Sequence, residues 1–111
     1  MHEMSIATSI LDIAEQSMNG HENLLSISVR IGELAGIEFE ALEFCFKALK
    51  ESSRYPDLTL EIERVPGRGK CKKCGTESPM REVFALCPEC GQYGLEPVGG
   101  QELKVTSIEV E

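Results

Sequence analysis

Four of the five cysteines form two identical pairs, and their spacing is typical of a metal site. Cys71 and Cys74, followed by Cys87 and Cys90, make the pattern C-x2-C-x12-C-x2-C, with a glycine directly after each pair. Two residues between thiolates allow one tight turn to direct both sulfurs toward a single ion, and glycine lets the backbone curl there. Because two such turns supply the closed tetrahedral thiolate set that Zn(II) favours, we expect a structural zinc site whose binding largely folds this segment.

Other functions of these cysteines fit the sequence less well. A thioredoxin-like redox site would use one C-x2-C pair after a strand and at the start of a helix. A catalytic zinc needs an open coordination position, which four cysteines do not leave. Since no nucleophile with a partner base is recognisable either, we expect that the protein is not an enzyme. Cys45, the fifth cysteine, lies on the apolar side of a predicted helix and is interpreted as a buried thiol.

The first three residues, Met1, His2 and Glu3, could form a second metal site of a different kind. The α-amine, the deprotonated His2 backbone amide and the His2 ring lie along a short path and can close adjoining chelate rings near one plane. Square-planar nitrogen ligation suits Ni(II) or Cu(II) and offers no advantage to zinc or magnesium. The reference pKa of an α-amine, about 7.7–8.0, leaves a usable neutral fraction at pH 7. A terminal histidine is also commonly just solvated, and His21, which follows a predicted helix end, is interpreted as a solvated loop residue.

The apolar residues that would position these groups alternate between helical and strand periodicity. Helical spacing of three and four residues runs through residues 5–18 and 37–53. Alternation typical of strands with one buried side occurs in residues 24–32, 57–65 and 102–111. In the first of these strands the expected buried set is Leu25, Ile27, Val29 and Ile31. The glycine-rich stretches 66–70 and 96–101 flank the cysteines and are interpreted as linkers.

This order of elements predicts an α+β fold. Two helices pack on a three-stranded sheet, and a small zinc-ribbon-like lobe is inserted before the last strand. We expect a nickel-binding α/β domain of residues 1–66 plus 99–111 and a zinc-binding domain of residues 67–98.

The charge of the chain limits its partners. A net charge of −8 over 111 residues argues against a nucleic-acid binder, which normally needs a basic surface. Residues 1–63 carry twelve acidic and four basic side chains, whereas residues 64–81 carry six basic side chains against Glu77 alone. No apolar run approaches the length of a membrane span, and no signal peptide is visible, so we expect a cytoplasmic protein. That reducing compartment favours metal ligation over disulfides.

Several segments resemble the HypA/HybF family of nickel metallochaperones for [NiFe]-hydrogenase maturation. They are MHEMSIATSILDIAE, ISVRIGELAGI, LEFCFKAL, the two cysteine pairs and the SIEVE ending, in matching order over nearly the whole chain. The resemblance implies a nickel-binding α/β lobe with an inserted zinc lobe. It implies nickel ligands at Met1 through its amine, at His2 through ring and backbone, and at Glu3 through backbone or carboxylate. Glu38 is a further acidic candidate, and the four paired cysteines are the implied zinc ligands.

The resemblance also implies a carrier with protein partners. These are a nickel-handling GTPase of the HypB type and the hydrogenase large subunit, and a homodimer is one option for the working form. We expect no nucleic acid and no membrane among the partners. The alternative interpretation is a zinc-ribbon protein-interaction module without nickel transfer, in which Met1 and His2 have no role and the basic zinc lobe binds an acidic protein surface or RNA.

Overall fold

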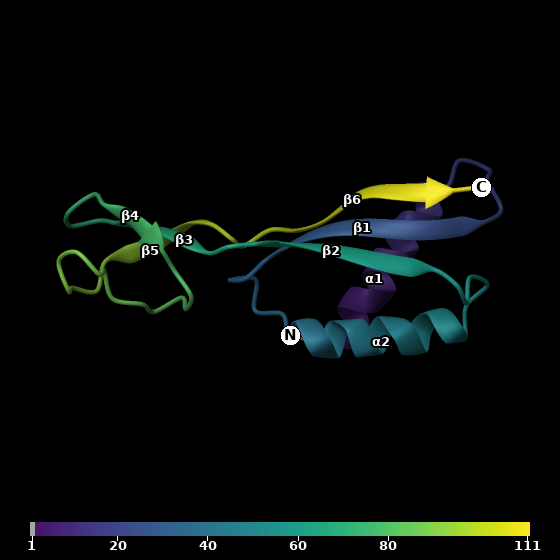
Figure 1. Cartoon of the computed structure of the whole chain (residues 1–111), viewed down its shortest axis with the longest axis horizontal. Coiled ribbons are helices and arrows are strands. Elements are labelled where there is room, and N and C mark those ends of the chain that lie inside the picture. The colour runs from purple at the N-terminus through teal and green to yellow at the C-terminus, as the bar shows by residue number, and fades with distance from the viewer. Residues whose placement is uncertain (1) are drawn as a thin grey trace. The chain divides into compact units, whose positions relative to one another are not determined.

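The structure is a computed structural model of the chain, and it describes residues 2–111. The elements are α1 (Glu3–Gln16), β1 (Leu24–Gly32), α2 (Phe39–Glu51), β2 (Thr59–Val65), β3 (Arg68–Cys71), β4 (Glu77–Pro79), β5 (Leu95–Gly99) and β6 (Leu103–Val110). One three-stranded sheet has the order β2-β1-β6, and a second has the order β4-β3-β5 (Figure 1). The predicted fold, two helices with a three-stranded sheet and a small inserted zinc lobe, is confirmed.

The chain divides into two compact units. The first contains the residues up to Arg30 together with Ile37–Glu63 and Lys104–Glu111. The second contains Ile31–Gly36 and Arg64–Leu103, and therefore includes the cysteines. Within the described residues, no helix is both long enough and apolar enough to cross a membrane.

Both helices bury one side in the first unit, as their periodicity predicts. Helix α1 buries Ile6, Ala7, Ile10, Leu11 and Ala14. Ile13 is 47% exposed, and the neighbouring Ala14 continues the buried side of the helix. Helix α2 packs against α1 and buries Leu42 and Phe46. Cys45 is half-buried rather than buried, which corrects the interpretation of its thiol, because the side of α2 centred on Leu42 and Phe46 turns Cys45 toward the boundary with solvent.

The central strand β1 supplies the most deeply buried part of this core. Ile27, Val29 and Ile31 are at most 1% exposed. At the start of the strand Leu24 is 2% exposed and Leu25 is 39% exposed. The expectation that Leu25 shares the buried face is therefore wrong, because Leu24 fills the core at that end and the alternation of buried residues begins only at Ile27.

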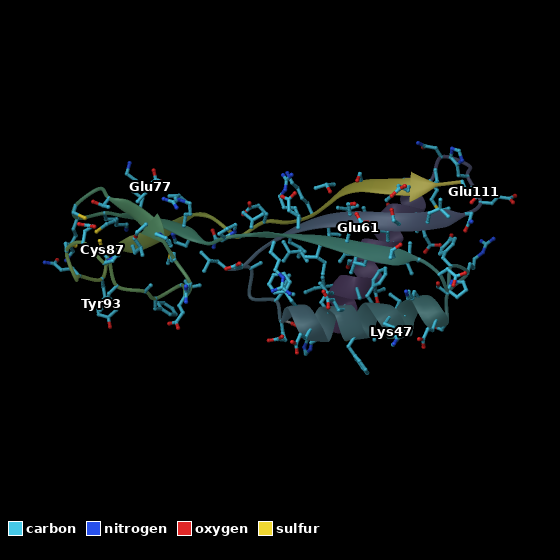
Figure 2. All side chains as sticks on the ribbon, viewed as in Figure 1. Lys47, Glu61, Glu77, Cys87, Tyr93 and Glu111 are labelled. Atoms are coloured by element: carbon cyan, nitrogen blue, oxygen red, sulfur yellow. The ribbon has the colours of Figure 1, made fainter. Side chains whose placement is uncertain are left out.

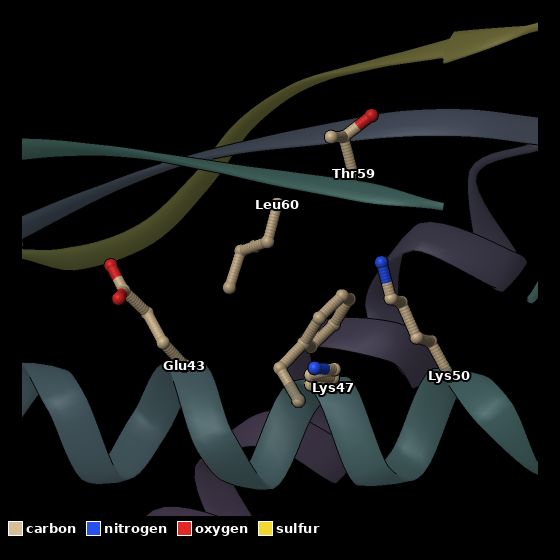
Figure 3. A pocket seen from close by; sticks show the side chains of 6 residues that line it. Glu43, Lys47, Lys50, Thr59 and Leu60 are labelled. Carbon is tan, nitrogen blue, oxygen red and sulfur yellow. The ribbon is translucent and has the colours of Figure 1, made fainter. Parts of the chain in front are cut away.

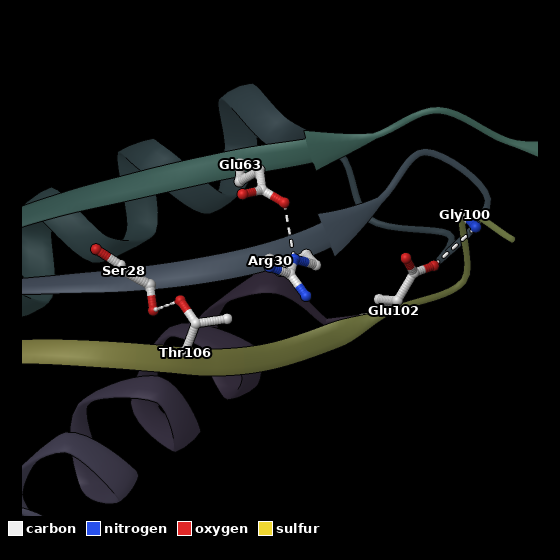
Figure 4. A network of polar contacts seen from close by, with 6 residues as sticks. All are labelled: Ser28, Arg30, Glu63, Gly100, Glu102 and Thr106. Carbon is white, nitrogen blue, oxygen red and sulfur yellow. Dashed lines mark hydrogen bonds and ion pairs between the residues drawn. The ribbon is translucent and has the colours of Figure 1, made fainter.

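The sheet around β1 is mixed. The Leu25 carbonyl accepts from Thr59 Oγ1 at 3.2 Å, and the Glu33 N–H donates to the Val65 carbonyl at 2.9 Å. Residue numbers rise together along both strands, so β1 and β2 are parallel, with α2 as the crossover that parallel strands require. On the other side, the Thr106 hydroxyl donates to the Ser28 carbonyl, and the Glu111 N–H donates to the Asn23 carbonyl, so β6 runs antiparallel (Figure 4). Strands β2 and β6 are consequently the two edges.

The glycine-rich stretches around the cysteines are strands and not the linkers that their composition predicts. Strand β3 pairs antiparallel with both β4 and β5, and Gly69 lies opposite Ser78 and Pro97. A Cβ atom at Gly69 would lie 2.6 Å from Leu95 Cγ and 2.8 Å from Met80 Sδ. Glycine is therefore present at this position because packing leaves no room for a side chain, whereas composition alone suggests flexibility.

Candidate metal centre

The four paired cysteines converge in the second unit. Their sulfur atoms all lie within 4.8 Å of one another (Figure 2 labels Cys87 within this group). The Cys71 and Cys90 sulfurs are 3.7 Å apart, as are the Cys74 and Cys87 sulfurs. A tetrahedral zinc ion with Zn–S bonds of about 2.3 Å places its sulfurs about 3.8 Å apart. The donor set and its spacing therefore fit a closed four-cysteine zinc site, and no ligand position is left open for catalysis.

Two tight turns of the same design present these sulfurs. The Gly75 N–H donates to the Cys71 carbonyl at 2.9 Å, and the Gly91 N–H donates to the Cys87 carbonyl at 2.8 Å. Both glycines are left-handed, with φ of +76° and +72°, a conformation that residues with a Cβ rarely adopt. Strand β3 ends at Cys71, so the sheet delivers the first sulfur and the turn adds the second.

The site is buried on one side only. Cys71 and Cys87 are 1% exposed and belong to an apolar cluster with Leu34, Met80 and Leu95, against which Ala85 packs. Cys74 and Cys90 are exposed. One cysteine of each turn is therefore packed in the apolar cluster, and the other lies at the surface. This arrangement suits a structural ion that holds the lobe together.

Hydrogen bonds prepare some of the thiols for ligation. The side chain and then the backbone N–H of Thr76 lower the pKa of Cys74 to about 6. The backbone N–H groups of Cys74 and Lys73 lower the pKa of Cys71, and the Lys73 nitrogen lies 3.4 Å from its sulfur. A backbone hydrogen bond from Gln92 lowers the pKa of Cys90. Local desolvation of its sulfur, although the residue is exposed, and hydrogen bonds with the other three thiols outweigh that effect and raise this pKa to about 11. Since thiolates are the zinc ligands, metal binding must displace a proton from at least one cysteine.

The N-terminal residues lie at the start of α1 in the first unit. His2 is the N-cap residue of α1, with extended φ and ψ of −89° and 108°, and its side chain makes no capping hydrogen bond. The His2 carbonyl accepts the first hydrogen bond of the helix, from the Ile6 N–H at 3.2 Å. The N–H groups at a helix start, in contrast, have no acceptor within the helix. The His2 ring is exposed. A backbone nitrogen and an imidazole therefore stand together at a helix end, next to Met1, which lies outside the described residues.

The starts of the two helices meet at a pair of glutamates. The Glu38 N–H donates to Glu3 Oε2 at 3.3 Å. Glu38 is the N-cap residue of α2, and its Oε1 accepts from the Glu40 N–H at 3.3 Å. The packing of α1 against α2 thus brings Glu38 beside the residue that follows His2, although 35 positions separate the two glutamates.

The remaining candidate residues lie elsewhere. His21 is exposed beyond the far end of α1, and a helix of 14 residues spans about 21 Å. Cys45 is on α2 and is not part of the four-cysteine group.

Two contacts near the cysteines could not be predicted from the sequence. Leu34, from the segment after β1, is part of the apolar cluster around the cysteines, and Lys72 Nζ forms an ion pair with Glu96 Oε1 at 2.9 Å.

Comparisons with known proteins agree with this geometry. Residues 1–110 match the family model described as "Hydrogenase/urease nickel incorporation, metallochaperone, hypA". The hydrogenase maturation factors HypA of Geobacter metallireducens and Geobacter sulfurreducens are 47% and 46% identical to this chain, over all of both chains in each case. The solution structure of the Ni metallochaperone HypA from Helicobacter pylori has a similar fold, with a TM-score of 0.66 at 23% identity over 99% of this chain and 97% of that one.

Proposed function

Because this chain belongs to the HypA family of hydrogenase/urease nickel-incorporation metallochaperones, we propose that it binds Ni(II) at its N-terminus and delivers the ion during [NiFe]-hydrogenase maturation. The ligands in this proposal are the Met1 amine, the ring and backbone of His2, and the backbone or carboxylate of Glu3. The protein is a carrier and not an enzyme, and its four-cysteine zinc site has a structural role.

One observation carries the nickel site: α1 begins at Glu3, directly after an uncapped, exposed histidine. A helix starting there leaves the His2 backbone nitrogen outside the helical hydrogen-bond ladder, so that it can be deprotonated and bound by a metal. Square-planar nitrogen ligation of this kind suits Ni(II). Glu3 and Glu38 add carboxylates beside the same point, which supports the binding of a cation.

The exposed position of this site is consistent with transfer. Ligands on one short terminal segment can leave the ion one after another, and a partner can replace each of them in turn. We assign the partner roles to a HypB-type GTPase and the hydrogenase large subunit, in the cytoplasm, with a homodimer as one option for the working form. Residues 1–66 plus 99–111 form the nickel-binding domain in this proposal, and residues 67–98 form the zinc-binding domain.

Nickel titration of the zinc-loaded, untagged protein tests the proposal. We expect one nickel per chain, near-complete loss of binding in His2→Ala and no change in His21→Ala, which removes the other histidine at an exposed loop position. Zinc content, measured by elemental analysis, should be the same in all three proteins. Zinc without nickel in the parent protein would instead favour a zinc-ribbon interaction module.

A further inference from the structure

Strand β2 has an open side. In the sheet order β2-β1-β6 its partner among the described strands is β1. The Val65 carbonyl accepts from Glu33 on the β1 side. Because main-chain groups alternate along a strand, the N–H and C=O groups of Leu60 and Ile62 point to the open side. A row of such groups is a template for pairing with another chain.

A groove runs beside this edge, between β2 and α2. Its volume is about 210 Å³, and its lining residues are Glu43, Phe46, Lys47, Lys50, Thr59 and Leu60 (Figure 3). Leu60 extends from β2 toward α2, where Phe46 provides a second apolar surface. The Lys50 ammonium donates to the Leu58 carbonyl at 2.8 Å, so it is held at the beginning of β2. The groove therefore offers an apolar interior to side chains that enter from the edge.

The opposite face of β2 is acidic. Glu61 and Glu63 alternate with the half-buried Leu60 and Ile62. Arg30 pairs with Glu63 at 2.7 Å (Figure 4). Both Glu61 and Glu63 line a shallow depression on the sheet. A second copy of this chain is a poor partner for the edge, because pairing β2 with itself sets glutamates opposite glutamates. A strand with basic side chains on that face is favoured.

We propose that β2 and the adjacent groove bind an extended segment of a partner protein in which apolar and basic residues alternate. The segment adds as a fourth strand, and main-chain hydrogen bonds to Leu60 and Ile62 set its position. Its apolar side chains enter the groove between β2 and α2. Its basic side chains lie on the acidic face, beside Glu61. Binding in this form requires that the partner segment alternate apolar and polar residues and that its polar residues be basic.

Two synthetic peptides of one composition separate these requirements: KVRIKVR alternates, and KKRRVVI has its charges in one block. The full-length, zinc-loaded and nickel-free protein is titrated with each at 0.15 M salt, and binding is followed by fluorescence anisotropy and backbone amide NMR. We expect KVRIKVR to bind at least about fivefold more tightly and to shift amides of residues 43–50 and 59–65. Equal binding of both peptides, shifts centred on β6, or dimerisation through β2 would overturn the proposal.

Charge exchange gives a second test. Glu61→Arg should weaken KVRIKVR at least about fivefold and should improve binding of the acidic peptide EVEIEVE, because unlike charges are favoured across neighbouring strands. Glu22→Arg makes the same change of charge at an exposed position before β1 and should leave both affinities unchanged. Circular dichroism verifies that each variant is folded. An equal effect of the two substitutions would show that only the net charge acts, and the strand site would then be rejected.

Discussion

The cysteine cluster and the N-terminus differ in how firmly the surrounding residues hold the candidate metal ligands in place. Cys71 and Cys87 are 1% exposed within an apolar cluster, and glycine turns direct their sulfurs. His2 is exposed, and its ring makes no capping hydrogen bond with the helix that follows it. A closed and supported set of thiolates retains its ion, whereas a terminal set can release it. Under the proposed function, the same small protein thus pairs a metal that stabilises structure with a site suited to cargo.

The largest expected effect is at the four-cysteine zinc site, two of whose ligands are held by the core of the second unit. Cys87→Ser should abolish stoichiometric zinc binding and disorder residues 67–98, because one of two core-anchored ligands is lost. The helices α1 and α2 should persist, since they pack against each other in the first unit. Elemental analysis and amide NMR measure both outcomes, and Cys45→Ser is the control that should keep zinc. Global unfolding of Cys87→Ser, seen by circular dichroism, would remove the distinction between the two units.

The next largest effect is expected at the proposed N-terminal nickel site. Placing Gly-Ser before Met1 converts the α-amine into an amide and deletes no side chain. Nickel affinity should fall about as far as in His2→Ala, while zinc content stays the same. In the proposed site the amine is a ligand, and the amide nitrogen that replaces it would first have to lose a proton. Calorimetric nickel titration measures the change. An extended protein that bound one nickel with the parent affinity would rule out this ligand set.

A moderate effect is expected at the surface of the zinc site. Thr76→Val removes the hydroxyl that is the largest cause of the low pKa of Cys74, so that this pKa should rise from about 6 toward its ordinary value of 9.0. Zinc affinity at pH 7 should then fall several-fold, because Cys74 binds the ion as a thiolate. Competition of the folded, zinc-loaded protein with a chelator, repeated from about pH 6 to 8, measures the affinity and its pH profile. Thr76→Ser keeps the hydroxyl and should retain the parent profile; a shift there would assign the low pKa to another group.

A smaller effect is expected at Glu38. Glu38→Gln keeps a side-chain oxygen for the Glu40 N–H but removes the charge beside Glu3. Nickel affinity should fall a few-fold with the melting temperature unchanged. Glu38→Ala also loses the N-cap and should lower stability by about 1 kcal/mol. If Gln and Ala lowered nickel affinity and stability in parallel, Glu38 would act only by capping α2.

The smallest effect is expected at the basic residues beside the first cysteine pair. Lys72 is paired with Glu96 at the surface, and hydrogen bonding to that carboxylate and its charge raise the pKa of Lys72. Exposed pairs of this kind contribute little to stability, because solvent and salt screen them. Charge reversal at Lys72 and Lys73 should therefore leave nickel titration and zinc content unchanged and weaken one partner interaction in a salt-dependent manner. If this double variant lost nickel binding, the residues beside the zinc site would influence the N-terminal nickel site, contrary to the prediction.

Much of the zinc site could be predicted from the sequence because its geometry is local. Two residues between cysteines and a following glycine determine a tight turn whatever the rest of the chain does, and the turns at Gly75 and Gly91 have the backbone that this spacing requires. The helices and the strands of the first sheet are local in the same sense, since their periodic apolar residues define their buried sides. The proposed terminal chelate of Met1 and His2 would likewise depend on adjacent atoms only.

Contacts between distant segments were decided by the tertiary structure. Glu38 meets Glu3 only because α1 packs against α2, and Leu34 joins the cysteine core only because the segment after β1 belongs to the second unit. Gly69 looks like part of a linker until the side chains of Leu95 and Met80 occupy the space beside it. The open edge of β2 follows from the sheet order. Each of these results depends on which surfaces pack together, and a periodic pattern specifies that a side is buried without specifying what covers it.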